Sequence, residues 1–344
     1  MADVPSRVMA AQAEAAGLPL RLVYISMATP LAGEVLIRIM ACGICHSDLH
    51  LVDGDWVNGS FPIIPGHEIA GVVEAIGTDV TDVCLGDRVG IPWIYSTCGR
   101  CDACKRGDDP LCTHRETTGL TVQGGYSEFI VAPARSVVKI PDNIPYHMAA
   151  PLFCAGLTSY SGLKLAAIKP GETVAIHGVG GLGHVAIQIA RHFGARVIAL
   201  TRSAQKRKLC EDLGADETIV AEEENTGAIL QAAGGADVVF SCTPDPSHLG
   251  NLLIGLRGNG RIVIVGAGAG TMTVRPKDLI HRRLRIMGSP VGTHADMRET
   301  LNLAAAGVIH VKVKCYSLTE VNTALSELRN GSVHFRLVLL PSPS

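Results

Sequence analysis

The sequence lacks the features that mark membrane, secreted and nucleic-acid-binding proteins. None of its apolar runs approaches the roughly twenty residues that span a bilayer. Its formal net charge of -2 provides no basic field for a nucleic-acid backbone or an anionic lipid surface. The first residues, MADVPSRVMAAQAEAAG, place no basic region before an apolar core, so we expect no secretion signal. We therefore expect a soluble, cytoplasmic protein that binds neither nucleic acid nor membranes.

Cysteine is the residue type that the sequence does supply in a telling pattern. Eleven cysteines in a chain without a secretion signal indicate a reducing compartment, in which thiols stay free or bind metal. Four of them, Cys98, Cys101, Cys104 and Cys112, form a C-x2-C-x2-C-x7-C cluster. Four thiolates complete the tetrahedral shell of zinc and leave no open position. The cluster therefore predicts a structural zinc site that organises a loop.

The length of the chain and its hydrophobic periodicity indicate two domains. A chain of 344 residues is longer than one hydrophobic core usually covers. Between Leu31 and about Lys139, short alternating segments separated by glycine and proline are typical of a mostly antiparallel β domain. After Pro151, apolar strands and helical segments alternate, which indicates βαβ units and a parallel, doubly wound sheet. The predicted strands cover residues 34–39, 69–76, 88–92, 126–131, 173–177, 196–200, 218–220, 237–242, 261–265 and 335–340, and the predicted helices cover residues 182–193, 204–213 and 249–256.

A glycine-rich segment, HGVGGLGH, separates the predicted strand 173–177 from the predicted helix 182–193. Glycines at these spacings permit a tight turn and close backbone approach to a pyrophosphate, which the helix N-terminus also attracts. The candidate cofactor-binding residues of this loop are Gly178, Gly180, Gly181, Leu182 and Gly183. A glycine-rich turn without a ligand is the competing interpretation, and the surrounding βαβ pattern favours a dinucleotide.

The end of the next predicted strand bears on the choice of cofactor. An acidic residue about twenty positions after such a loop normally bonds the adenosine ribose. Here the strand 196–200 is followed by Thr201, Arg202 and Ser203. Two hydroxyls and a guanidinium suit a 2′-phosphate, which a carboxylate would repel, so NADP(H) is favoured. The alternative is that Arg202 is a solvated surface charge and the protein uses NAD(H).

A second set of candidate metal ligands is spread along the chain. Cys45 lies in CGICHSDLH, His67 and Glu68 lie in PGHEIAG, and Cys154 lies in PLFCAGLTSY. Two thiolates and one imidazole give zinc three protein ligands and leave a fourth position for water or substrate. Taken singly, Cys154 is also explained as a buried core thiol, and His67 as a histidine bonded to a backbone carbonyl.

In combination, the motifs resemble those of the medium-chain, zinc-dependent alcohol dehydrogenases. The four-cysteine cluster, GHE, CHSD and the glycine-rich loop carry the resemblance, which runs over nearly the whole chain. It implies an α/β protein with a GroES-like, mostly-β catalytic domain (residues 1–152 and 292–344) and a Rossmann cofactor domain with a doubly wound parallel sheet (residues 153–291). The short interval between Cys112 and Cys154 is similar to that of the microbial and yeast-like members, which implies a homo-oligomer, a tetramer or a dimer.

The resemblance also implies the roles of the metal ligands. Cys45, His67 and Cys154 would bind a catalytic zinc, and the four clustered cysteines a structural zinc. Glu68 is similar to a carboxylate of the family that can exchange onto the metal. Zinc would then make the alcohol O–H acidic, while hydride passes between the substrate carbon and the nicotinamide C4.

Further roles follow from the same resemblance. Ser47 and His50 resemble the family's proton relay, Asp48 resembles the carboxylate that orients His67, and His46 and Arg336 occupy positions that contact cofactor phosphates in relatives. The competing interpretations are local turn capping for Ser47 and Asp48, a solvated site for His50 and a surface arginine for Arg336. Trp56 and Trp93 match positions that narrow the substrate pocket, although core packing also explains both.

The leading functional prediction is a zinc-dependent alcohol dehydrogenase or aldehyde reductase that uses NADP(H) in preference to NAD(H). A narrow pocket would favour primary or aromatic alcohols. The alternatives are an NAD(H)-dependent alcohol or polyol dehydrogenase of the same fold, a zinc-free relative, and a non-enzymatic zinc-binding interaction protein. The net charge and the nucleotide loop count against the last of these.

Overall fold

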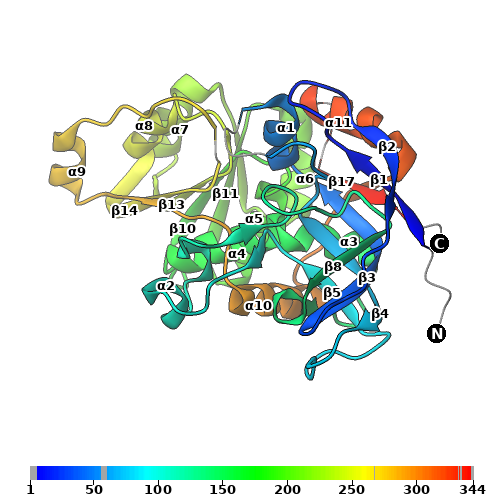
Figure 1. The fold of residues 1–344 in the computed structure, drawn as a ribbon. Coiled ribbons are helices and arrows are strands. Elements are labelled where there is room, and N and C mark those ends of the chain that lie inside the picture. Colours follow the sequence, from blue (N-terminus) through cyan, green and yellow to red (C-terminus); the bar gives the residue numbers. More distant parts are fainter. Residues whose placement is uncertain (1–5, 56–59, 267, 332, 334, 342–344) are drawn as a thin grey trace. The chain divides into compact units, whose positions relative to one another are not determined.

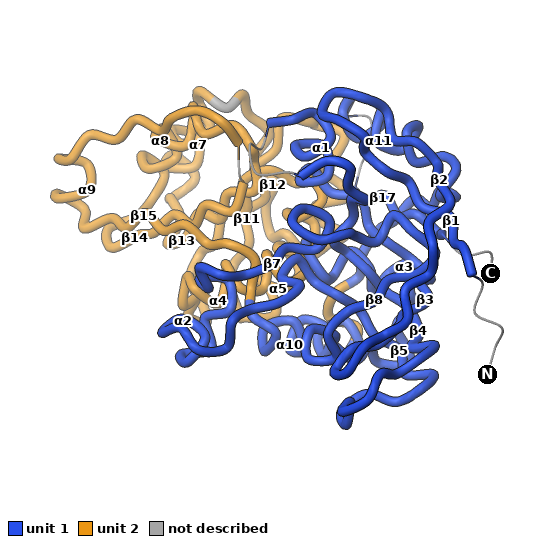
Figure 2. Tube along the Cα trace, in the orientation of Figure 1, with its two compact units in different colours: residues 1–154, 293–306, 310–344 blue, residues 155–292, 307–309 orange. Residues whose placement is uncertain are grey.

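The computed structural model describes residues 6–55, 60–266, 268–331, 333 and 335–341 (Figure 1). The chain divides into two compact units (Figure 2). Unit 1 consists of residues 1–154, 293–306 and 310–344, and unit 2 of residues 155–292 and 307–309. None of the helices among the described residues combines the length and the apolar character that a bilayer crossing requires.

A β-sheet that is almost entirely antiparallel forms the core of unit 1. Its strands lie in the order β16-β17-β3-β4-β5-β9, with β8 paired to β3, and every pair is antiparallel except β16 with β17. These strands are β3 (Glu34–Ile44), β4 (Glu68–Ile76), β5 (Arg88–Ile91), β8 (Phe129–Pro133), β9 (Val138–Lys139), β16 (Val313–Ser317) and β17 (Arg336–Leu340). The sheet confirms the predicted mostly-β domain.

Smaller elements complete unit 1. They are β1 (Arg7–Gln12), β2 (Arg21–Ser26), α1 (His46–Asp53), β6 (Ile94–Ser96), α2 (Asp102–Lys105), β7 (Glu116–Thr117), α3 (Tyr146–Ala149), α10 (His294–Ala305) and α11 (Val321–Arg329), with 3-10 turns η1 (Asp109–Leu111), η2 (Ala134–Ser136), η3 (Ala150–Phe153) and η6 (Leu318–Glu320). Helix α1 begins immediately after the central strand β3. The Asp48 side chain accepts a hydrogen bond from the backbone N–H of Cys45, and the helix ends at Gly54 in a left-handed conformation.

Several predicted bounds differ from those in the structure. The strand predicted at residues 34–39 continues to Ile44 as β3. The strand predicted at residues 126–131 begins at Phe129, because Tyr126 pairs instead with the backbone of Pro65 and Ala11. The predicted boundaries assigned residues 153 and 154 to the cofactor domain and residues 292 and 307–309 to the catalytic domain. In the structure the first two lie in unit 1 and the others in unit 2. Phe153 is fully buried, and its turn η3 packs against β3, β4 and β5.

Unit 2 contains the predicted parallel sheet. Its six strands lie in the order β12-β11-β10-β13-β14-β15, and all pairs are parallel. The elements are α4 (Ala155–Leu165), β10 (Thr173–His177), α5 (Gly183–His192), β11 (Arg196–Thr201), η4 (Ala204–Lys206), α6 (Arg207–Asp212), β12 (Glu217–Val220), α7 (Glu223–Ala232), β13 (Ala236–Ser241), α8 (Leu249–Leu252), η5 (Leu253–Gly255), β14 (Leu256–Ile264), α9 (Pro276–Arg282) and β15 (Arg285–Gly288). The order places β10 and its following loop beside both β11 and β13, which is the arrangement of a doubly wound dinucleotide fold.

An ion pair between Arg261 and Glu172 connects the first strand of this sheet to neighbouring elements. Arg261 in β14 is 4% exposed and forms two hydrogen bonds with the Glu172 carboxylate, at 2.9 and 2.6 Å. Its guanidinium also donates to the carbonyls of Ala166 and Ala167, which follow α4. The hydrogen bond from Arg261 lowers the pKa of Glu172 from its ordinary value. The pair therefore connects α4, β10 and β14.

We predict that Glu172→Gln lowers the free energy of unfolding by about 1–3 kcal/mol at neutral pH, because the buried guanidinium loses its counter-charge. Since the folded-state pKa of Glu172 is lowered, its contribution is present above the ordinary glutamate pKa and is lost as the pH falls through the lowered value. Urea unfolding of both proteins at several pH values measures the difference. Glu217→Gln is the control, because its pair with Arg196 is 44% and 36% exposed and contributes about 0–1 kcal/mol.

Candidate active site

The structure brings the predicted metal ligands together in two groups within unit 1. In each group, one ligand atom per residue lies within 4.8 Å of every other. The first group consists of Cys98, Cys101, Cys104 and Cys112, and the second of Cys45, His67, Glu68 and Cys154. Among the described residues these are the groups that can hold a metal ion, and Cys42 belongs to neither.

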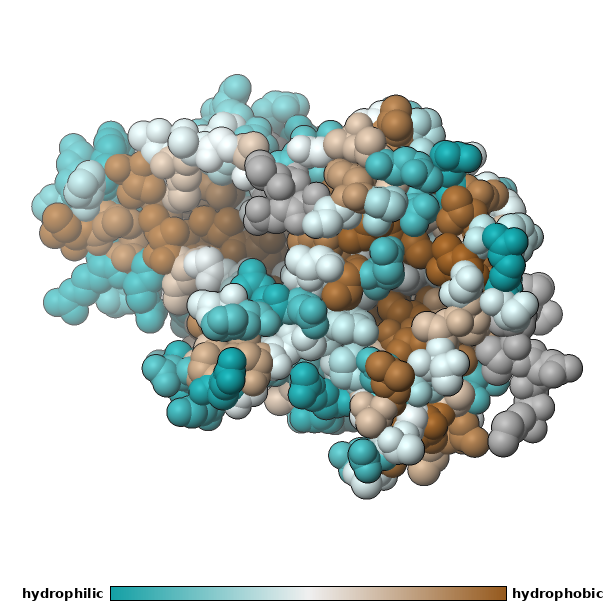
Figure 3. All heavy atoms as spheres, viewed as in Figure 1, coloured by the Kyte–Doolittle hydropathy of each residue, from teal (hydrophilic) through white to brown (hydrophobic). Residues whose placement is uncertain are grey.

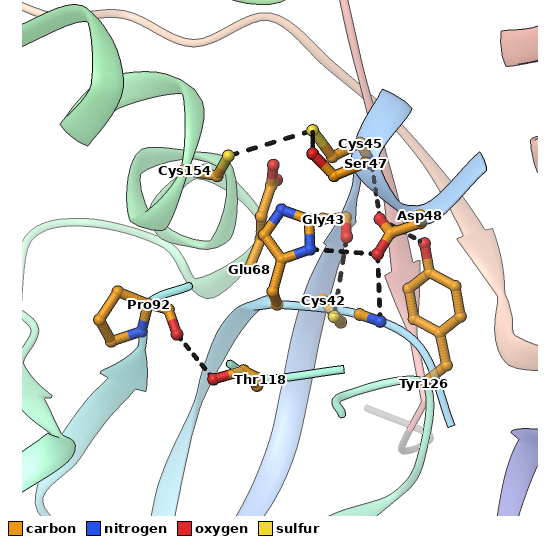
Figure 4. Close-up of polar contacts among 12 residues, drawn as sticks. Cys42, Gly43, Cys45, Ser47, Asp48, Glu68, Pro92, Thr118, Tyr126 and Cys154 are labelled. Carbon is orange, nitrogen blue, oxygen red and sulfur yellow. Dashed lines mark hydrogen bonds and ion pairs between the residues drawn. The ribbon is translucent and has the colours of Figure 1, made fainter. Parts of the chain in front are cut away.

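Three structural elements supply the second group (Figure 4). Cys45 is the residue between β3 and α1, His67 directly precedes β4, and Cys154 directly follows η3. The Sγ atoms of Cys45 and Cys154 lie 4.0 Å apart. Because β3 and β4 are paired with Gly43 opposite Glu68, the strand register places the GHE motif beside the CHSD motif.

Two buried atoms of this group have no hydrogen-bond partner among the described residues. They are His67 Nε2 and Glu68 Oε2. Leaving such a polar atom unpaired in a protein interior costs about 1–3 kcal/mol. A divalent cation held by two thiolates and an imidazole satisfies the imidazole nitrogen, and this donor set suits zinc. The residues present therefore fit a zinc ion.

The electrostatic environment of the second group favours a thiolate on Cys45. Its hydrogen bond with Cys154 lowers the pKa of Cys45 well below the ordinary value, and His67 and Arg336 act in the same direction against burial. The same contact, together with burial, raises the pKa of Cys154. Burial raises the pKa of Glu68 to about 7, although Arg336 opposes the rise. An added cation would stabilise both thiolates, because metal binding displaces protons from its ligands.

Asp48 holds His67 in one orientation. Its Oδ1 accepts a hydrogen bond from His67 Nδ1 at 3.1 Å, and both side chains are almost fully buried. A carboxylate can only accept, so Nδ1 carries a proton, and in the neutral imidazole that binds a metal the lone pair is on Nε2. Burial alone lowers the pKa of His67, but Asp48 and Cys45 raise it by more than burial lowers it, so the pKa lies well above its ordinary value. The orienting role that was implied for Asp48 thus has a geometric basis.

Arg336 is buried at the first position of β17 and forms an ion pair with Glu68. The resemblance to the family implied a contact between Arg336 and cofactor phosphates. In this structure its guanidinium donates to the Glu68 carboxylate, beside the candidate metal ligands. Contact with a phosphate stays a prediction. Glu68, Cys45 and Cys154 raise the pKa of Arg336 against the effect of burial, so its charge is secure.

The remaining predicted residues of the CHSD motif lie on α1. Ser47 Oγ is 3.7 Å from Cys45 Sγ, which places the hydroxyl next to a candidate metal ligand. His50 is three residues further along the helix, and its Nδ1 lies 2.8 Å from Asp55 Oδ2. His46 is exposed at the start of the helix. The relay role of Ser47 and His50 stays a prediction.

One of the two predicted pocket tryptophans is close to the metal ligands. The Trp93 ring meets the His67 ring edge-on, with centroids 4.6 Å apart. Trp93 is half-buried, so it combines packing against His67 with exposure of part of its ring. Trp56 lies outside the described residues.

The four-cysteine group forms a separate lobe around α2 and η1. The Sγ atom of Cys98 lies 3.9 Å from that of Cys104 and 3.7 Å from that of Cys112, and the Cys101 and Cys104 Sγ atoms are 3.5 Å apart. Backbone N–H groups of Arg100 and Cys101 lower the pKa of Cys98 to about 6. These N–H donors stabilise thiolates, which are the form that binds zinc.

The candidate cofactor loop follows β10 in unit 2. Gly178 has a φ of +89°, a conformation that favours glycine, and a Cβ on Gly183 would collide with the Gly178 carbonyl. A Cβ on Gly180 would meet nothing within 4 Å, so the backbone there is open to a ligand. Gly181 and Leu182 lead into α5, whose N-terminus attracts anions.

The residues predicted to distinguish NADP(H) from NAD(H) lie at the end of β11. Thr201 ends the strand, and its hydroxyl accepts a hydrogen bond from the Ser203 N–H at 3.2 Å. Arg202 is exposed between them. Lys206, which was not predicted, donates from Nζ to the Val179 carbonyl in the glycine loop at 2.8 Å. No sequence motif marks Lys206, because its contact with the glycine loop depends on how β11 lies beside that loop.

Comparisons with known proteins assign the chain to a family. Residues 31–142 match the family described as Alcohol dehydrogenase GroES-like domain, and residues 181–306 match the family described as Zinc-binding dehydrogenase. An alcohol dehydrogenase from Geobacillus stearothermophilus is 41% identical over 309 residues, which cover 89% of this chain and 92% of the relative. The chain belongs to the zinc-dependent medium-chain alcohol dehydrogenase family. The predicted family and fold class are confirmed.

Solved structures of medium-chain dehydrogenases agree with the assignment. A cinnamyl alcohol dehydrogenase from Sorghum bicolor superposes with a TM-score of 0.90 at 31% identity, covering 97% of each chain. An acetophenone reductase from Geotrichum candidum, solved in complex with NAD, superposes with a TM-score of 0.90 at 31% identity and covers 98% of each chain. The chain is thus an oxidoreductase of this family over nearly its full length.

We predict that Cys104→Ala removes the zinc of the four-cysteine group and lowers the melting temperature, while zinc remains at the other group. Three thiolates bind zinc more weakly than four, and the lobe loses the metal that folds it. Elemental analysis per subunit and thermal unfolding measure the two effects. Cys84→Ala is the control, because Cys84 is an exposed free thiol outside both groups. Equal zinc content in the Cys104 variant and the wild type would contradict the assignment.

Proposed function

We propose that the protein is a zinc-dependent alcohol dehydrogenase or aldehyde reductase that transfers hydride between an alcohol and a nicotinamide cofactor. The observation that carries the proposal is the buried group of Cys45, His67 and Cys154, with Asp48 on the far nitrogen of the imidazole. Such a group supplies three zinc ligands and leaves one position for substrate. Glu68, held by Arg336, is the adjacent carboxylate that can exchange with a ligand.

Zinc and the nicotinamide cofactor would each supply one part of the chemistry. Zinc in the Cys45, His67 and Cys154 group acts as a Lewis acid toward the alcohol or carbonyl oxygen. The nicotinamide supplies or accepts the hydride. The chain itself contributes the orientation of both groups and the handling of the proton.

Ser47 and His50 carry the proton between substrate and solvent. The Ser47 hydroxyl, which lies next to Cys45, accepts the proton of the substrate hydroxyl and passes its own proton on toward His50. His50 is on the same face of α1, three residues further along, and its side chain is 23% exposed. Asp55 contacts its Nδ1, and the imidazole receives the proton that Ser47 passes on. The imidazole then releases the proton to water.

NADP(H) is the proposed cofactor in preference to NAD(H). The glycine loop after β10 and the N-terminus of α5 hold the pyrophosphate. Thr201, Arg202 and Ser203, at the end of β11, offer two hydroxyls and a guanidinium where a carboxylate would exclude a 2′-phosphate. The alternative is NAD(H), which is the cofactor in the solved acetophenone reductase complex.

Primary or aromatic alcohols and their aldehydes are the proposed substrates. The Trp93 ring, edge-on against a metal ligand, narrows the space beside the metal and offers a flat apolar surface. Slim or planar molecules suit such a surface better than bulky secondary alcohols. The similarity to a protein named as a cinnamyl alcohol dehydrogenase supports an aromatic substrate.

A cytoplasmic homo-oligomer, a tetramer or a dimer, completes the proposal. All eleven cysteines are free, which suits a reducing compartment. Strand β15 lies at the edge of the unit 2 sheet, where Ile286 is 38% exposed and Ile280 in the nearby α9 is 72% exposed. Figure 3 shows hydrophobic residues gathered on the visible face of this part of unit 2. An edge strand flanked by exposed apolar side chains is suited to pair with a second copy.

We predict that Cys154→Ala abolishes turnover, removes about one zinc per subunit and leaves dinucleotide binding nearly unchanged. The substitution removes one of three ligands without touching the glycine loop. Steady-state kinetics, elemental analysis and fluorescence titration with NADPH measure the three quantities. Cys210→Ala, which changes a buried thiol of unit 2 outside both metal groups, should keep its activity and zinc. Comparable turnover in the Cys154 variant would refute the metal assignment.

We predict that Arg202→Asp reduces kcat/KM for NADP(H) by about 10- to 100-fold and changes the value for NAD(H) much less. A charge-assisted hydrogen bond to phosphate contributes about 1.5–3 kcal/mol, and 1.4 kcal/mol corresponds to a factor of ten. Arg202→Gln, which removes attraction without adding repulsion, should show a smaller loss. An unchanged ratio of kcat/KM values for the two cofactors would show that Arg202 does not read the phosphate.

A further inference from the structure

The Asp48 carboxylate accepts four hydrogen bonds in the interior of unit 1. Its Oδ1 accepts from His67 Nδ1 at 3.1 Å and from the Gly66 N–H at 3.2 Å. Its Oδ2 accepts from the Cys45 N–H at 2.8 Å and from the Tyr126 hydroxyl at 2.9 Å. Two of the donors are parts of metal-ligating residues, one precedes a ligand in the chain, and Tyr126 alone belongs to a distant segment (Figure 4).

Tyr126 is fully buried and bonds the carboxylate oxygen opposite to the one that faces His67. Its side chain is 0% exposed, and its hydroxyl points at Oδ2. Each carboxylate oxygen accepts two hydrogen bonds, so a rotation of the carboxyl group strains all four, and burial shields them from bulk solvent. The Oδ1 atom is therefore kept in line with His67 Nδ1.

The segment that carries Tyr126 also holds the loop that carries His67. The N–H groups of Gly124, Gly125 and Tyr126 donate to the carbonyls of Ile64, Gly66 and Pro65, at 2.7, 2.8 and 3.0 Å. The Tyr126 ring lies against Gly66, where a Cβ would come within 2.5 Å of the ring. One short segment thus fixes both the backbone before the histidine ligand and the carboxylate behind it.

We propose that Tyr126 is a positioning residue for the metal ligand His67, acting through Asp48. The inference rests on the proposed zinc site and goes beyond it by assigning a role to a residue that touches neither metal nor substrate. Without the Tyr126 hydroxyl, Oδ2 keeps a single donor, the Cys45 N–H, so the Asp48 carboxylate has more freedom to tilt and His67 Nε2 is held less firmly toward the metal. The alternative is a purely structural role, in which Asp48 only satisfies the buried hydroxyl of Tyr126 and the orientation of His67 does not depend on that bond.

The test is zinc release from the full-length, zinc-loaded protein bearing Tyr126→Phe, which removes one oxygen and keeps the ring. A chelator in excess, with a colorimetric zinc indicator, resolves release from the two metal groups. Loss of an outer partner of a ligand weakens metal retention by about 10- to 100-fold, and we expect the lower end for a partner one step further away. Release from the Cys45, His67 and Cys154 group should therefore accelerate about tenfold, and release from the four-cysteine group should not change.

Tyr95→Phe is the matched control. Tyr95 is a half-buried tyrosine of unit 1 whose hydroxyl donates to the Val131 carbonyl at 3.0 Å, with no link to Asp48. This variant loses a hydrogen bond of the same kind, and its two release rates should equal those of the wild type. Replacing the released zinc with cobalt adds a spectroscopic readout, because the visible absorption of cobalt reports the geometry of the ligands and should shift in the Tyr126 variant alone.

Two results would overturn the inference and leave the metal assignment standing. The first is equal release from the His67 group in the wild type and the Tyr126 variant. The second is an equal acceleration at both metal groups, which would indicate general destabilisation. A wild-type protein that carries zinc only at the four-cysteine group would instead refute the proposed catalytic site, and the inference with it.

Discussion

Four hydrogen bonds to one buried carboxylate keep the candidate active site in shape. The Asp48 carboxylate accepts hydrogen bonds from the Cys45 N–H at the start of α1, from His67 Nδ1 and from the Tyr126 hydroxyl. The same group therefore fixes where the helix begins, how the imidazole is turned and where the loop before β4 lies. Burial makes each of these contacts costly to lose, because an unpaired polar group in the interior loses its interaction with bulk water.

The two metal groups differ in the way that their proposed roles require. The four-cysteine group is built within one short lobe, is buried only at Cys112 and offers sulfur ligands alone. The other group draws on three separate elements, is mostly buried and combines thiols, an imidazole and a carboxylate that already has a cationic partner. Local chain geometry suffices for the first, whereas the second exists only when the β sheet has brought β3, β4 and η3 together.

Local patterns were enough to predict much of this structure, and contacts between distant segments were not. Alternation and apolar runs predicted most strands of both sheets, with β10 at its observed bounds, but missed β9, β15 and β16. The cysteine spacing predicted the four-cysteine group. Helix α7 was missed, because EENTGAILQA has weak apolar periodicity. The hydrogen bond between Tyr126 and Asp48 joins residues 78 positions apart, and the pair of Arg336 with Glu68 joins residues 268 apart. No spacing rule reaches such pairs, because they depend on the folded register of the strands.

The pairing of Arg336 with Glu68 sets an order of events while the chain is being made. A ribosome must synthesise β17, which lies next to β3, before the Glu68 carboxylate acquires its counter-charge. Until then the nascent protein has an incomplete sheet and an uncompensated acid beside Cys45 and His67. The four-cysteine lobe has no such dependence, since all its ligands lie between Cys98 and Cys112. All ligands of that lobe are therefore present once Cys112 has been made, whereas the other group reaches its final charge balance only after residue 336 has emerged and folded back.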